Sequence, residues 1–352
     1  MDQQRAQDFM RKVVGDVGTA LAVALIYIGD RVGLFNKMAG AGPLTAEQLA
    51  ERAGIHPRYA EEWLGAMVCN GYVEFDASAL TYTLPDEHAL FMATSKTEYY
   101  LGGLFKGTPA MMAAAPQVGD AFESGKGVSF QAFGAWVPGS LEAMNRNLYE
   151  ARLVKTWLPA MPDVVQRLAD GGRAIDIGCG TGIVPVLIAQ AFPRAMVEGL
   201  DFDAASIEIA RENARRAGVS ERMQFHAVSA TGWSPAGAMD FVSTFDCIHD
   251  MPDPLAVLKN IRRALAPGGT YLMVEPKLSE HLADNVAHPF ARLFYGMSCL
   301  HCVPQSIAQG GPGLGACWGE GRARVMAQAA GFTQFRALPI RSPSQAFYEL
   351  RA

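Results

Sequence analysis

The sequence of 352 residues contains few cysteines and no large excess of charge of either sign. Its six cysteines are sparse and scattered, a pattern typical of reduced thiols and not of a disulfide framework. Thirty basic residues stand against thirty-five acidic ones, and the net charge of −5 gives no general attraction for nucleic acid or an anionic membrane. The chain also has no internal repeat and no low-complexity tract. Half of the residues are hydrophobic, so a large buried core is expected.

A secretory leader and a membrane-spanning segment are not expected either. The N-terminus mixes charges of both signs and lacks the basic-then-apolar order of a signal peptide. The most apolar early run, TALAVALIYIG, lies between Asp16 and Asp30 and is shorter than the ~20 residues of a spanning helix. We therefore predict a cytoplasmic chain without a membrane partner, in which residues 13–36 form an apolar helix at a subunit interface.

Residues 1–94 have the pattern of a winged-helix domain. Thr45 and Gln48 have the spacing of a capping box, which predicts a helix that begins after Thr45. A second helix is expected over 56–71, and YVEFD and LTYTL then form a hairpin. Helix, helix and hairpin in this order describe a winged helix.

A winged helix can read DNA, so a cofactor-sensing regulator is an alternative to an enzyme. The candidate recognition helix carries Arg58 against Glu61 and Glu62, whereas a helix that enters a DNA groove should be basic. We therefore predict a homodimer held by this N-terminal domain, without nucleic acid as a partner.

The pattern changes twice after the winged helix. Residues 95–165 look helical but are interrupted by glycine and proline, and we expect them to link the domains and to wall a substrate pocket. Residues 166–352 alternate strands with helices, which predicts an α/β fold with a Rossmann-like, doubly wound parallel sheet. The expected strands are RAIDIG, MVEGLD, MQFHAVS, FVSTFDCI and TYLMVEP.

The first of these strands runs into a glycine-rich turn, AIDIGCGTGIVPV. Gly178, Gly180 and Gly182 permit a tight turn and close approach of a ligand. Asp201 ends the next strand, 23 residues after the first glycine, which is the spacing of a carboxylate that accepts ribose hydroxyls. Asp176 would repel a pyrophosphate but can hold an ammonium group. S-adenosylmethionine has a ribose, an α-ammonium and no phosphate, so it fits better than a dinucleotide, whose fingerprint is G-x-G-x-x-G.

IDIGCGTG and GLDFDAASIEIAREN resemble the first two motifs of class I S-adenosylmethionine-dependent methyltransferases. The chain from about residue 20 to 350 resembles small-molecule methyltransferases with an N-terminal winged-helix dimerisation domain, among them bacterial and mycobacterial members and plant-type O-methyltransferases. The resemblance implies S-adenosyl-L-methionine as cofactor and a small, aromatic or otherwise apolar methyl acceptor. It adds Phe202, Ser229, Ala230 and Asp246 to the residues around the cofactor. Ser229 stands where the family often has an acid that contacts the adenine amino group.

FDCIHDMPDP resembles the HD element of plant and bacterial O-methyltransferases, whose histidine is the general base. The match makes His249, at the end of the fourth strand, the candidate base. Asp250 or Glu275 could orient the ring through its second nitrogen and stabilise the imidazolium. Glu320 in WGEGR is either a third polar group beside the base or an ordinary acid in the first turn of a helix. O-methylation is favoured, while N-, C- or S-methylation by positioning alone and a non-methylating reaction of the same cofactor stay open.

Acidic residues near the fourth and fifth strands raise the alternative of a magnesium site. Asp246, Asp250, Asp253 and Glu275 could bind Mg²⁺ together, because carboxylate oxygens are its preferred ligands. However, Asp253 lies between two prolines and looks like a helix start, and His249 interrupts the acids. We therefore predict a reaction without Mg²⁺.

The motif CLHC, residues 299–302, raises the alternative of a zinc site. It is a single C-x₂-C pair without a second pair at finger spacing, so Cys317 and His301 would complete a site only by accident of folding. We predict no metal here and an apolar wall of the acceptor pocket instead. The wall is expected to contain Phe294, Tyr295, Met297 and Trp318, with His301 as a polar contact.

Overall fold

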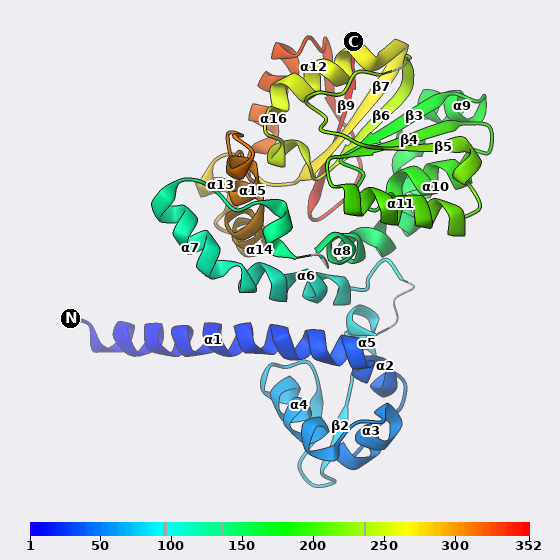
Figure 1. The fold of residues 1–352 in the computed structure, drawn as a ribbon. Coiled ribbons are helices and arrows are strands. Elements are labelled where there is room, and N and C mark those ends of the chain that lie inside the picture. Colours follow the sequence, from blue (N-terminus) through cyan, green and yellow to red (C-terminus); the bar gives the residue numbers. More distant parts are fainter. Residues whose placement is uncertain (94–96, 135–136, 236) are drawn as a thin grey trace. The chain divides into compact units, whose positions relative to one another are not determined.

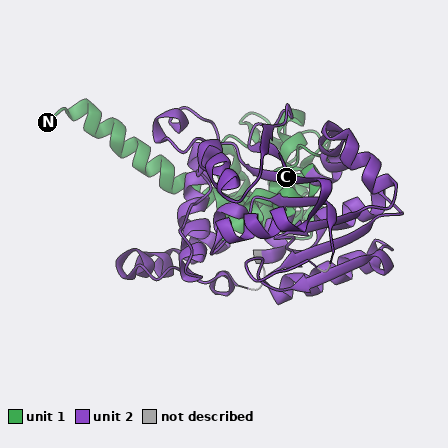
Figure 2. Ribbon diagram, turned by 90° about the horizontal axis from the view of Figure 1, so that it is seen from above, with its two compact units in different colours: residues 1–109, 143–148 green, residues 110–142, 149–352 purple. Residues whose placement is uncertain are grey.

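The computed structural model describes residues 1–93, 97–134, 137–235 and 237–352. The chain divides into two compact units (Figure 2). Unit 1 contains residues 1–109 and 143–148, and unit 2 contains residues 110–142 and 149–352. The segment expected to link two domains is therefore shared between the units.

Unit 1 begins with one long helix, α1 (Gln3–Val32), drawn in dark blue in Figure 1. It ends where Gly33 takes the left-handed conformation with φ of 76°, and the short helix α2 (Leu34–Met38) follows. The helix predicted over 13–36 is therefore longer at its N-terminus. Among the helices in the described ranges, α1 is the one long and apolar enough to cross a membrane by length and composition, with 17% of its most apolar window buried. The apolar run TALAVALIYIG is too short to span a membrane, but the helix that contains it has 30 residues.

The rest of unit 1 starts with the predicted winged helix. Its elements are α3 (Ala46–Ala53), α4 (Pro57–Cys69), β1 (Glu74–Asp76), β2 (Thr81–Thr83) and α5 (Asp86–Met92). Thr45 and Gln48 form the predicted capping box at the start of α3. Trp63 of α4 donates from Nε1 to the carbonyl of Leu25 in α1 at 2.8 Å. A Cβ on Gly29 would lie 2.5 Å from the Trp63 ring, so glycine is needed where α1 meets α4.

A run of helices follows the winged helix and is divided between the two units. Its elements are α6 (Gly102–Ala113), α7 (Ala115–Ser124), η1 (Phe130–Phe133), α8 (Val137–Arg152), η2 (Leu153–Trp157), η3 (Leu158–Ala160) and α9 (Pro162–Ala169). The segment is helical and interrupted, as predicted, and α7 ends at Gly125, but the break expected near 107–109 is wrong because α6 continues through Pro109.

Unit 2 is built on a seven-stranded sheet with the order β5-β4-β3-β6-β7-β9-β8. The strands are β3 (Arg173–Ile177), β4 (Met196–Asp201), β5 (Met223–Ala227), β6 (Met239–Phe245), β7 (Leu265–Pro276), β8 (Gln334–Ala337) and β9 (Gln345–Arg351). The five predicted strands, β3 to β7, pair in parallel. β9 runs antiparallel to both β7 and β8, and neither β8 nor β9 was predicted. The sheet is therefore mostly parallel, and its chain order reverses at β3, where a ligand site is expected.

Helices cover both faces of this sheet (Figure 1), as a doubly wound fold requires. They are α9, α10 (Ile183–Ala191), α11 (Ala204–Arg216), α12 (Pro254–Ala264) and α16 (Gly319–Ala329). Buried side chains of α12 and α16 share one core cluster with the sheet. The short elements η4 (Ser220–Arg222), η5 (Ile248–Asp250), α13 (Leu282–Asn285), α14 (Ala291–Met297), η6 (Ser298–Cys302) and α15 (Val303–Ala308) complete the unit. Four of them lie in the chain between β7 and α16.

Candidate active site

The glycine-rich turn connects β3 to α10. Gly178, Gly180 and Gly182 all have positive φ, at 73°, 52° and 82°. A Cβ on Gly178 would lie 2.7 Å from Cys247 Sγ, and one on Gly182 would lie 2.8 Å from Ala210 Cβ. A Cβ on Gly180 would meet no atom within 4 Å, so space is open at the middle of the turn. The turn thus combines a backbone that only glycine adopts easily with room for a ligand.

Two buried carboxylates lie at the ends of the neighbouring strands β3 and β4. Asp201 accepts the N–H of Gly180 at 2.8 Å and the N–H of Asp203 at 2.9 Å. Asp176 accepts the hydroxyl of Ser243 at 2.6 Å. Neither carboxylate forms an ion pair with a residue in the described ranges.

The environment of both carboxylates disfavours their negative charge. Burial, reinforced by the charge of Asp201 and opposed by the Ser243 bond, raises the pKa of Asp176 to about 8. Burial also raises the pKa of Asp201, against backbone hydrogen bonds from Asp203, Gly180 and Phe202 that lower it. A cationic ligand would relieve both effects, so the pair fits the ammonium and sulfonium charges of S-adenosylmethionine.

Asp246, at the end of β6, is held by residues that the sequence motifs did not indicate. Its backbone has a positive φ of 50°, which is uncommon for a residue other than glycine. Its Oδ2 accepts Gln345 Nε2 at 2.8 Å and the Tyr149 hydroxyl at 3.4 Å. Its Oδ1 is buried without a hydrogen bond. Burial and the charge of Glu275 raise the pKa of Asp246 to about 6. The strained backbone and the unsatisfied oxygen indicate a position prepared for a ligand.

The other predicted cofactor residues differ in their surroundings. Phe202 is exposed, and its ring contacts that of Phe130 edge to face at 5.5 Å. Ser229 is exposed as well, whereas Ala230 is buried in the core. Glu142 was not predicted, and it accepts the hydroxyl of Thr181 in the glycine turn.

His249 lies in η5, which begins shortly after the end of β6, and the residue is 2% exposed. Its Nδ1 is 2.5 Å from Oε2 of Glu275 at the end of β7. Glu275 also accepts the Ile248 N–H at 3.0 Å and Trp318 Nε1 at 3.1 Å. Its carboxylate therefore fixes the orientation of the imidazole and leaves Nε2 as the nitrogen that can accept a proton.

Asp250 faces the other side of the same ring. Its Oδ1 lies 3.3 Å from His249 Nε2 and has no hydrogen bond, while Oδ2 accepts Gln305 Nε2 at 2.5 Å. Burial lowers the pKa of His249, but the charges of Asp250 and Glu275 outweigh it, so the pKa lies well above 6.5. The two acids that were expected to orient the base thus both contact it.

Glu320 and Asp253 lie elsewhere in unit 2. Glu320 is half-exposed in the first turn of α16, and its carboxylate accepts Arg324 Nη2 at 2.6 Å. Asp253 is exposed and caps α12 by accepting the Ala256 N–H at 2.9 Å. The four acids considered for Mg²⁺ therefore do not all converge on one point.

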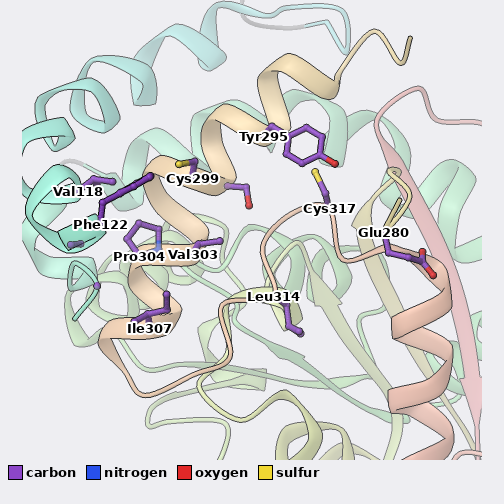
Figure 3. Close-up of a pocket in the computed structure, with 13 residues that line it drawn as sticks. Val118, Phe122, Glu280, Tyr295, Cys299, Val303, Pro304, Ile307, Leu314 and Cys317 are labelled. Carbon is purple, nitrogen blue, oxygen red and sulfur yellow. The ribbon is translucent and has the colours of Figure 1, made fainter. Parts of the chain in front are cut away.

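An apolar pocket of about 440 Å³ lies between α7, α14, η6, α15 and the loop before α16 (Figure 3). Val118, Phe122, Tyr295 and Leu314 are among its lining residues. Tyr295 is the one member of the predicted wall found there.

The other predicted wall residues do not line this pocket. Trp318 is buried and donates to Glu275. His301 is buried, and its ring contacts that of Phe133 at 4.7 Å. Phe294 contacts Phe290, and Met297 is half-buried at the end of α14.

Comparison with known proteins identifies both parts of the chain. Residues 19–94 match the Rv2258c-like winged HTH domain, and residues 168–330 match a methyltransferase domain. Both matches confirm the winged helix and the methyltransferase domain expected from the sequence.

Relatives and solved structures agree with these matches. Trans-aconitate 2-methyltransferase of Methylobacterium radiotolerans is 33% identical over 40% of this chain and 48% of its own. The chain thus spans about half the length of the curated relatives it matches. An O-methyltransferase family protein from Burkholderia thailandensis has a TM-score of 0.70 at 16% identity, over 97% of this chain and 98% of its own. Human N-acetylserotonin methyltransferase, solved in complex with S-adenosylmethionine, has a TM-score of 0.69 at 15% identity, over 100% and 98%.

Proposed function

We propose that this chain, a winged helix followed by a methyltransferase domain, transfers a methyl group from S-adenosylmethionine to an oxygen of a small, apolar acceptor, with His249 as the general base. The single observation that carries the proposal is the buried His249–Glu275 pair, whose members follow the end of β6 and end β7, and which so lies at the same sheet edge as the glycine turn after the parallel strand β3. The neighbours solved with S-adenosylmethionine or S-adenosylhomocysteine support the choice of cofactor.

The residues around the turn fit the cofactor. Asp201 presents a carboxylate to a ribose, and Asp176 presents a buried acid to a cationic group. Gly180 leaves open space between them. When bound, S-adenosylmethionine supplies an electrophilic methyl group on a sulfonium. Asp246 has a buried oxygen without a partner and is the next acid along the sheet edge that can hold a polar group of the ligand.

The role of His249 follows from its two ring nitrogens. Glu275 holds Nδ1, so Nε2 accepts the hydroxyl proton of the acceptor as the methyl group is transferred. Asp250 and Glu275 then stabilise the resulting imidazolium, which burial alone would destabilise. Because the pKa of His249 is raised, the free base becomes more abundant as the pH rises above the ordinary histidine range. The proposed reaction needs no metal ion, so we expect that EDTA does not lower turnover.

The apolar pocket is the proposed acceptor site. Cys317 lines it, and the next residue, Trp318, donates to the carboxylate that holds His249. Val303 also lines it and directly follows Cys302, whose thiol lies beside His249. The wall of this pocket and the surroundings of His249 are therefore built from adjacent residues of the chain.

We also propose a cytoplasmic homodimer held by α1. All six cysteines are free, as expected in a reducing compartment. Residues Val14, Val17 and Leu21 expose an apolar face along α1, and exposed patches of this kind usually mark an interface. Arg58 of α4 pairs with Glu61 and Glu62, which supports a role in assembly over one in DNA binding.

Calorimetry with Asp201→Asn tests the cofactor site. The variant loses a charge-assisted hydrogen bond worth about 1.5–3 kcal/mol, so the affinity for S-adenosylmethionine should fall by roughly tenfold or more. NAD, titrated into the wild-type chain, serves as the control ligand. Unchanged affinity in the variant, or tighter binding of NAD, would contradict the proposal.

A further inference from the structure

A buried cluster beside the proposed base has the composition of a metal site. A ring nitrogen of His249, a carboxylate oxygen of Asp250 and Sγ of Cys302 lie within 4.8 Å of one another, the one such group found in the described ranges. We propose that these three side chains bind a zinc ion that blocks the base and inhibits methyl transfer. The inhibition rests on the proposed role of His249, whereas the binding itself does not.

The separations of the ligand atoms are close to those of a tetrahedral zinc site. Zn–N bonds of about 2.0–2.1 Å and Zn–O bonds of about 2.0–2.2 Å place neighbouring ligand atoms roughly 3.3–3.5 Å apart. His249 Nε2 and Asp250 Oδ1 already lie 3.3 Å apart. With a Zn–S bond of about 2.3 Å, the sulfur needs to be roughly 3.6 Å from the nitrogen. Cys302 therefore has to approach by at most about 1.2 Å, the difference between 4.8 Å and roughly 3.6 Å, which a side-chain adjustment can supply.

The surroundings of the cluster also suit a metal. Asp250 Oδ1 is a buried oxygen without a hydrogen bond, and such an atom is costly unless a ligand satisfies it. Glu275 holds Nδ1 of His249, which is the carboxylate–histidine arrangement that orients zinc-binding histidines. The side-chain amide of Gln305 donates to the second oxygen of Asp250 and so fixes the orientation of that carboxylate. Each of these two ligands is thus fixed by a neighbour.

The donor set selects the metal. A thiolate and an imidazole favour zinc over Mg²⁺ or Ca²⁺, which prefer oxygen ligands alone. Binding displaces to solvent the thiol proton of Cys302 and, where His249 is protonated, its Nε2 proton, and it forms a Zn–S and a Zn–N bond. Three protein ligands leave a fourth position for water. Zinc on Nε2 uses the lone pair with which His249 would accept the proton of the acceptor, so inhibition follows.

Zinc binding is tested on the full-length chain by competition with a chromophoric chelator. We expect one zinc ion per chain. Loss of a group that only orients a metal ligand weakens metal sites by roughly 10–100-fold, so Cys302→Ser, which removes a ligand itself, should weaken binding by about 100-fold or more. Cys299→Ser is the matched control, because Cys299 belongs to the same C-x₂-C pair but is exposed and outside the cluster. Co²⁺ in place of zinc should give a thiolate charge-transfer band in the wild type and in Cys299→Ser but not in Cys302→Ser.

Inhibition is measured as the ratio of methyl-transfer rates with and without zinc for each protein. The ratio should fall in the wild type and in Cys299→Ser and stay near one in Cys302→Ser. Calorimetry with S-adenosylmethionine checks that each variant is folded. Failure of the wild type to bind zinc, equal loss of binding in Cys299→Ser, or faster turnover with zinc would overturn the inference. The chelator titrations decide the site even if the proposed reaction fails, because they need no acceptor.

Discussion

Replacing Glu275 by glutamine tests whether its buried carboxylate controls both the stability of unit 2 and the state of His249. One oxygen accepts the Ile248 N–H at 3.0 Å, and the other accepts Trp318 Nε1 at 3.1 Å and lies 2.5 Å from His249 Nδ1. An amide has one oxygen, so in either orientation its NH₂ group faces an N–H donor. Removing one partner of a buried pair costs about 3–5 kcal/mol. At about 2–4 °C per kcal/mol for a unit of this size, the Tm should fall by roughly 6–20 °C.

The same change should remove the base. With NH₂ at the position of the second oxygen, the amide donates to Nδ1 of His249, and the ring proton moves to Nε2. The nitrogen that should accept the acceptor proton is then occupied. We expect kcat to fall by ~10²–10⁴, measured at a temperature where the variant is folded, with unchanged affinity for S-adenosylmethionine.

Glu198→Gln is the matched control. Glu198 is also a buried glutamate of unit 2 paired with a histidine, at 2.9 Å from His226 Nε2, and with Arg173 at 2.7 Å. Its replacement should lower the Tm in thermal unfolding and leave kcat at the wild-type value. A Glu275→Gln enzyme with wild-type Tm and kcat would refute the reasoning, as would an equal loss of kcat in Glu198→Gln.

Three further predictions follow from the charges and surfaces of the chain. Because burial raises the pKa of Asp176 to about 8, binding of the cationic cofactor at pH 7 should release protons, seen as buffer-dependent binding heats whose buffer dependence is smaller in Asp176→Asn. Asp250→Asn removes a carboxylate that raises the pKa of His249, so the rise of kcat/KM with pH, measured with EDTA present, should move to lower pH; an unmoved profile would argue against this pairing. Leu21→Glu on α1 should give a monomer in light scattering, whereas Leu80→Glu, equally exposed at 65%, should stay dimeric.

The sequence predicted the five parallel strands because buried parallel strands are nearly continuous apolar runs. β8 and β9 escaped prediction for a physical reason. β8 is largely exposed and carries no apolar run. β9 contains Glu349, a buried acid whose charge is compensated by Arg336 and Arg351. β9 is a stable inner strand only because it pairs with β7 on one side and β8 on the other.

The local motifs of the site were also predictable, but its tertiary partners were not. The glycine turn and the HD element are short sequence patterns, and the structure places against His249 Glu275, one of the two acids that could orient its ring. Tyr149 and Gln345, which hold Asp246, come from about one hundred residues away on either side. Trp318 was expected on the substrate wall because aromatic residues are common there, yet its indole N–H is bound to Glu275. Such long-range hydrogen bonds leave no local pattern in the chain.

The central claim is methyl transfer to a small acceptor with His249 as base. It is tested most directly by incubating the wild type and His249→Ala with methyl-deuterated S-adenosylmethionine and fractionated small metabolites, and following labelled products by mass spectrometry. The account predicts a labelled apolar product from the wild type. It also predicts a rate lower by ~10²–10⁴ in His249→Ala, which should still bind the cofactor. The absence of any labelled product, or an unchanged rate in His249→Ala, would contradict it.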